Sequence, residues 1–148
     1  MGRLQGNRAV CVAPPAACGA ALPGHDFADC YEIAVAPDLD APEAVRRIFA
    51  NPPRWAAMLM DLRDALVGPF GLKPAPSTGF PVISERPDEV VLGFDDTHLD
   101  FRIVARVAGG RATLTTLVRR HNIWGRLYLA AVTPFHRRIA RAFAERMA

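Results

Sequence analysis

The sequence has few cysteines and no long hydrophobic run. Its three cysteines, Cys11, Cys18 and Cys30, are an odd number and include no C-x-x-C pair. This pattern argues against a disulfide-stabilised secreted domain and against a cysteine-rich zinc site. No apolar stretch approaches the roughly 18–20 residues that a transmembrane helix needs. We therefore expect a cytoplasmic protein that does not insert into a membrane.

Motifs for metal, cofactor and nucleophile sites are also missing. The four histidines form no H-E-x-x-H pair, and the chain contains neither G-x-S-x-G nor G-x-G-x-x-G. These patterns mark zinc hydrolases, serine hydrolases and dinucleotide-binding folds, respectively. We therefore expect no metal and no cofactor.

The composition is that of one globular domain. The 148 residues are 51% hydrophobic and 22% charged, which are ordinary values for a folded domain. Residues 1–24 are rich in Ala, Pro and Gly, and we interpret them as a flexible leader. We expect the folded domain to occupy residues 25–148.

Positive charge is concentrated near the C-terminus. From residue 119 onward the chain has seven arginines and one acid, Glu145. Aromatic residues there fall on the apolar side of the expected helix instead of between the arginines, so nucleic-acid binding is not expected. The favoured interpretation is a solvated helix face. The alternative is a surface that binds anionic lipid or an acidic partner, with Arg137, Arg138 and Arg141 among its arginines.

Hydrophobic periodicity predicts an α+β fold with the element order β-α-α-β-β-β-β-α. Strand-like alternation covers residues 27–36, 80–85, 89–95, 98–107 and 111–121, and the last four are joined by turns short enough for hairpins. Helical spacing follows a cap at Asp40 and resumes after residue 53. Residues 122–147 form a long amphipathic helix. Pro134 lies inside it, which predicts a kink near Thr133.

Four short phrases carry a resemblance to a known family. They are V-L-G at residues 91–93, H-L-D-F-R at 98–102, G-R-L-Y at 125–128 and P-F-H-R at 134–137. In this order and spacing they resemble domain-of-unknown-function family 2867, from about residue 27 to the end. The family is similar to the START-like, polyketide-cyclase-like (SRPBCC) helix-grip superfamily. That similarity implies an antiparallel sheet wrapped around a long C-terminal helix, with a ligand cavity between them. Relatives fused to short-chain-dehydrogenase-like domains imply a possible oxidoreductase partner.

The first candidate site is His98, Asp100 and Arg102. Strand alternation places these three side chains on one face. In a functional interpretation Asp100 orients His98 as a general base and Arg102 binds an anionic group. The alternative is a solvated cross-strand ladder.

The second candidate cluster lies at the start of the C-terminal helix and along it. His121 precedes the helix, Tyr128 lies on its apolar stripe, and His136 follows the expected kink. Trp55 and Arg63, on the expected second helix, are further candidates to line a cavity and its mouth. Each of these has an ordinary structural alternative as a core or surface residue.

Two hypotheses follow from different classes of protein. The first is that the domain binds a small apolar or amphipathic molecule between sheet and helix. The second is a cyclase-like or dehydratase-like enzyme that uses His98 with Asp100, or Tyr128 with His136, as acid and base. The sequence leaves the choice between them open.

Overall fold

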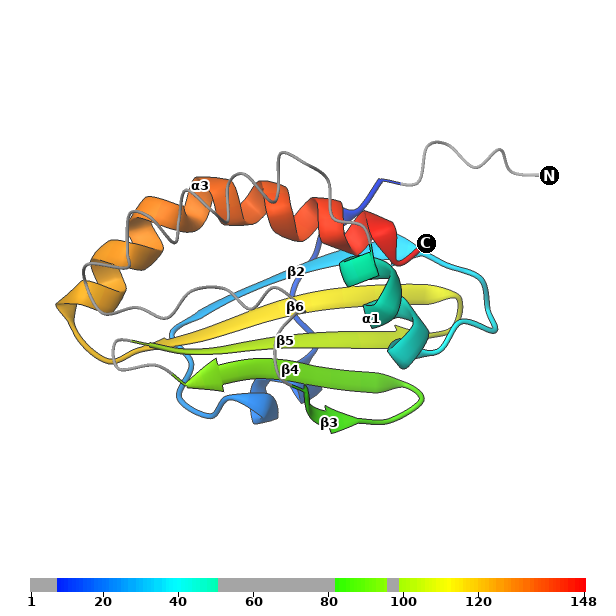
Figure 1. The fold of residues 1–148 in the computed structure, drawn as a ribbon, viewed down its shortest axis with the longest axis horizontal. Coiled ribbons are helices and arrows are strands. Elements are labelled where there is room, and N and C mark those ends of the chain that lie inside the picture. The colour runs from blue at the N-terminus through cyan, green and yellow to red at the C-terminus, as the bar shows by residue number, and fades with distance from the viewer. Residues whose placement is uncertain (1–7, 51–81, 96–98) are drawn as a thin grey trace.

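The computed structural model describes residues 8–50, 82–95 and 99–148 (Figure 1). These residues form a six-stranded antiparallel sheet in the order β1-β2-β6-β5-β4-β3, with two α-helices. The α+β class and the antiparallel sheet are therefore confirmed. The strands are β1 (Val10–Cys11), β2 (Phe27–Ala34), β3 (Val82–Glu85), β4 (Glu89–Asp95), β5 (Leu99–Ala108) and β6 (Arg111–Arg120). The helices are α1 (Ala41–Ala50), α3 (Ile123–Arg146) and the 3-10 helix η1 (Ala16–Ala21). The second helix expected after residue 53 lies outside the described residues.

Tight turns join β3 to β4 and β5 to β6. Arg86 N–H donates to Glu89 O over 2.8 Å and closes the first turn. Gly109 and Gly110 form the second with φ values of 58° and 77°. Positive φ at both central residues matches the twist of antiparallel strands, and glycine adopts it without strain. Local sequence is therefore sufficient to form these two hairpins.

The first long strand pairs with the last one. In β2 and β6 the register runs from Phe27 opposite Val118 to Ala34 opposite Arg111. Alternation along the strands gives the sheet two faces. The helix face, covered by α1 and α3, buries residues such as Tyr31, Ile33 and Leu114 against the helices. The opposite side is called the far face below.

The two helices are fastened to each other at the C-terminal end of α3. Arg146 Nε donates to the carbonyl oxygens of Arg47 and Ile48, both over 3.2 Å, so it caps the end of α1. At the start of α1, Asp40 Oδ1 accepts from Glu43 N–H over 2.8 Å, as the sequence predicts for this cap. Hydrogen bonds from the Arg146 side chain to backbone carbonyls thus hold α1 against this end of α3.

The helix α3 lies across the helix face of the sheet (Figure 1). It runs continuously through the exposed Pro134. Its C-terminal half buries Ala140 and Ala144, and small side chains there let the helix approach the sheet closely. The kink expected near Thr133 stays a prediction.

Residues 9–22 differ from the flexible leader that we expected. β1 extends the sheet beyond β2, with Val10 opposite Glu32. The 3-10 helix η1 then covers the far face, where Cys18 and Leu22 are buried against Val104 and Leu117. Ala21 packs against this cluster, whereas Ala13, Ala16 and Ala20 are exposed. The structured part of the chain begins before residue 25.

This packing predicts how the three thiols react. Cys11 is exposed, whereas Cys18 and Cys30 are buried. Burial raises the pKa of the Cys30 thiol to about 11, despite a hydrogen bond from the Thr115 hydroxyl. Near pH 8, a disulfide reagent should modify Cys11 rapidly and the other two only when the protein unfolds, because the thiolate is the reactive form.

A Cys11→Ser variant provides the control, and it should show almost no reaction in the native state. Mass spectrometry of the labelled peptides identifies the modified cysteine. Rapid labelling of Cys18 in folded protein would show that η1 does not stay packed on the far face.

Candidate functional site

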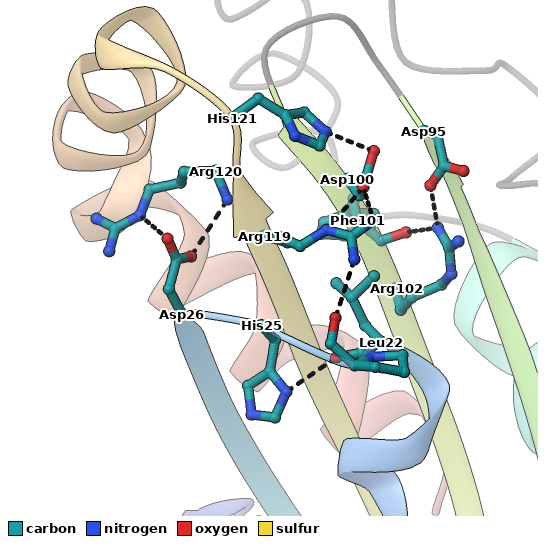
Figure 2. A network of polar contacts seen from close by, with 11 residues as sticks. Leu22, His25, Asp26, Asp95, Asp100, Phe101, Arg102, Arg119, Arg120 and His121 are labelled. Atoms are coloured by element: carbon teal, nitrogen blue, oxygen red, sulfur yellow. Dashed lines mark hydrogen bonds and ion pairs between the residues drawn. The ribbon is translucent and has the colours of Figure 1, made fainter.

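A buried carboxylate, Asp100, is the centre of a polar network on the far face (Figure 2). Asp100 on β5 lies opposite Arg119 on β6, and it is 3% exposed. Its Oδ2 accepts from Arg119 Nε over 3.1 Å, and its Oδ1 lies 2.9 Å from His121 Nε2. Both carboxylate oxygens therefore have a partner.

These partners also determine the ionisation of Asp100. Burial acts most strongly and by itself would raise the pKa. Hydrogen bonds from His121 and Arg119, together with electrostatic interactions with the same two residues, outweigh it and lower the pKa below its usual value of 3.8. Asp100 is therefore an anion at neutral pH, and its charge is balanced within the network.

The same network ties the N-terminal segment to the sheet. Arg119 Nη1 also donates to the carbonyl oxygen of Pro23 over 3.0 Å, just after η1. Arg120 binds Asp26 over 3.0 Å. Because Asp100 holds Arg119 in place and Arg119 holds Pro23, the network fits a structural role.

The first predicted site, His98, Asp100 and Arg102, is described only in part. His98 lies outside the described residues. Arg102 is on the same face as Asp100, yet its guanidinium binds Asp95 over 2.9 Å and donates to the carbonyl oxygen of Phe101 over 2.8 Å. Among the described residues, Asp100 bonds to Arg119 and His121. The β5–β6 register places Arg119 opposite Asp100, and His121 follows the end of β6.

A second carboxylate, Asp29, lies on the helix face. It comes from β2, where Asp29, Tyr31 and Ile33 alternate toward the helices. Its Oδ2 lies 3.0 Å from Nε2 of His136, which α3 brings to it from 107 residues away. The two side chains are 13% and 19% exposed. This pair joins the centre of α3 to the sheet.

The surroundings of the pair are mainly apolar. The ring of Phe27 meets the His136 ring edge to face, with the ring centroids 6.1 Å apart. On β6 the residues opposite Phe27 and Asp29 are Val118 and Thr116, both buried. Among the described residues, Asp29 Oδ1 is the buried side-chain oxygen or nitrogen that has no hydrogen-bond partner.

Tyr31 forms the next layer along β2. The guanidinium of Arg141 lies 5.9 Å from the centroid of its ring, in a cation–π contact. The pKa of Tyr31 is raised, first by burial and then by the negative charge of Asp29, while Arg141 acts in the opposite direction. The contact between β2 and α3 therefore includes Asp29, His136 and, at its exposed side, Arg141.

Of the predicted site residues, the structure places four in polar contacts. Asp100 and His121 meet each other, His136 meets Asp29, and Arg102 meets Asp95. Trp55 and Arg63 lie outside the described residues, and so does the side chain of Tyr128 on α3. Sequence reasoning missed Asp29 and the role of Arg119. A signal for Asp29 was present, since alternation places this acid among apolar residues.

Two kinds of feature are absent from the part of the chain that the structure describes. It contains no group of three or more His, Cys, Asp or Glu side chains arranged to hold a metal ion. It also contains no helix that is both long and apolar enough to cross a membrane.

The Asp100 network predicts a pH-dependent contribution to stability. Asp100→Asn should lower the free energy of unfolding by about 2 kcal/mol, because it removes a buried charge that is bonded to Arg119 and His121. Since the folded pKa is depressed, the contribution is complete above 3.8 and is lost as the pH falls below that value. Urea unfolding at pH 7 and near pH 3 measures both effects.

Asp95→Asn is the matched control. Its carboxylate is 64% exposed and pairs with Arg102, so its loss should cost about 0–1 kcal/mol. Equal destabilisation by the two variants at pH 7 would contradict the structural role assigned to Asp100.

Comparison with known proteins supplies a family and no function. No curated protein and no solved structure matches the chain. The model of one family, described as "Protein of unknown function (DUF2867)", matches residues 21–143. Since this match spans most of the 148 residues, the chain is a member of the DUF2867 family.

Proposed function

We propose that this domain binds a small apolar or amphipathic molecule between the helix face of the sheet and α3. The observation that carries the proposal is the buried Asp29 Oδ1, which lacks a partner. An unsatisfied buried polar atom costs about 1–3 kcal/mol, so native proteins rarely keep one without a reason. A bound molecule that supplies the missing hydrogen bond gives that reason.

The arrangement of elements supports the same proposal. An antiparallel sheet with a C-terminal helix across one face is the arrangement of START-like helix-grip domains, and we propose that architecture for this chain. In such an arrangement the space between sheet and helix is the natural place for an apolar ligand. Asp29 and His136 lie in that layer, whereas Asp100 lies on the opposite face.

A second candidate function is acid–base catalysis, which the Asp29–His136 pair favours. A carboxylate bonded to one ring nitrogen orients a histidine so that the other nitrogen can take a proton. The cyclase-like or dehydratase-like hypothesis thus moves from His98 and Tyr128 to this pair. It requires that a bound molecule is chemically changed on incubation, whereas a binding protein returns it intact.

The binding proposal predicts which residues change their NMR signals when a ligand binds. Titration with 2-methoxynaphthalene, a neutral apolar probe, should shift the amide NMR signals of Ile103 and Leu114, which face the helices. Their sequence neighbours Val104 and Thr115 should change much less, since they point to the far face. Native mass spectrometry of protein purified from its own host should show a bound small molecule. Shifts confined to the far face, or none at all, would contradict the proposal.

Pro134 provides a test of how a ligand enters. Proline inside a helix costs about 3 kcal/mol, and we propose that the resulting bend opens an entrance beside His136. Pro134→Ala should then raise the melting temperature and weaken binding of 2-methoxynaphthalene. A higher melting temperature with unchanged binding would mean that the bend serves packing alone.

A further inference from the structure

The chemistry around Asp29 restricts what the ligand can be. The Asp29 carboxylate has two oxygens, and His136 is bonded to Oδ2. A carboxylate oxygen accepts hydrogen bonds and cannot donate them while it is ionised. The group that completes Oδ1 must therefore carry an N–H or O–H. An ether, an ester or a ligand carboxylate does not meet this requirement.

Charge in the surrounding layer argues against a cationic donor. Arg141 lies over the ring of Tyr31, which is two residues along β2 from Asp29. The exposed Arg137 follows His136 on α3. Asp29 would attract an ammonium group, but that group would have to lose its hydration shell beside the apolar Phe27 and Val118. The positive charges of the two arginines weaken the attraction further. A ligand carboxylate would be repelled by Asp29 itself. A neutral hydroxyl avoids both conflicts.

The apolar neighbours indicate what the rest of the ligand is. Phe27 and Val118 lie beside the pair, and Phe101 packs with them on the helix face. Contacts with these side chains favour a hydrocarbon or aromatic body over a sugar or a nucleotide. Resting on the binding function proposed above, we infer that the ligand is a neutral, hydroxylated apolar molecule, an alcohol or phenol, which donates its O–H to Asp29 Oδ1.

Three probes with one ring system test this inference. 2-Naphthol donates a hydrogen bond, 2-methoxynaphthalene can only accept one, and 2-naphthoate is an anion. Wild-type protein should bind 2-naphthol about tenfold or more tightly than the ether, the ratio expected for one hydrogen bond to a charged group. 2-Naphthoate should bind more weakly than both. Dissociation constants come from NMR titration of the helix-face amides.

Two substitutions at Asp29 show whether this residue sets the preference. In Asp29→Asn the amide oxygen can stay bonded to His136, so the NH₂ group faces the ligand. This group donates to either probe, so the preference for 2-naphthol over the ether should fall to about onefold. Asp29→Leu removes the acceptor altogether and should give the same result if the Asn variant does not fold. Glu32→Gln is the matched control, because Glu32 is on the same strand, faces away and pairs with Arg111. Its preference should equal that of the wild type.

The outcomes separate this inference from the binding function. Equal binding of 2-naphthol and the ether, with shifts at Ile103 and Leu114, would overturn the hydroxyl inference and leave the binding function in place. A 2-naphthol preference that persists in both Asp29 variants would also overturn it. If no probe shifts the helix-face residues, both proposals fail.

Discussion

The antiparallel pairing of β2 with β6 determines the positions of the other parts of this structure. Eight consecutive residues of β2 are in register with β6. This register places Asp29 beside Thr116 under α3, and it places Cys30 beside Thr115 on the opposite face. Because side chains alternate with a period of two, a slip of one residue would move Asp29 to the wrong face and expose Tyr31 and Ile33. Burial of these apolar side chains under the helices therefore also fixes the position of the polar pair.

The buried Asp100 and the partly buried Asp29 illustrate different uses of the same chemical group. Asp100 has a partner for each oxygen and pairs with the Arg119 guanidinium, so its burial is compensated within the protein. Asp29 has His136 on one oxygen and no partner on the other. A saturated network stabilises one arrangement of the chain, whereas an incomplete one leaves hydrogen-bonding capacity for another molecule. This difference, more than the residue types themselves, separates a structural cluster from a candidate binding site.

The local sequence pattern predicts much of the fold but little of the candidate site. Alternation in β5 correctly placed Asp100 and Arg102 on one face, and short turns indicated the hairpins that end at β6. The partners of Asp100 depend on the register between strands, which local pattern does not contain. The contact between Asp29 and His136 joins residues 107 positions apart. The two-residue strand β1 is too short to show a period, so its Ala-rich surroundings resembled a leader.

The distance along the chain between β2 and β6 has a consequence for folding kinetics. The strands from β3 to β6 can pair with their neighbours through local turns, whereas Glu32 of β2 meets Arg111 of β6 across 79 residues. Closing so long a loop costs entropy before the pairing returns any stabilisation. During synthesis β2 leaves the ribosome well before its partner strand exists, and its unpaired backbone remains available to other chains until β6 is made. Docking of β2 is therefore the step at which this domain is most exposed to aggregation.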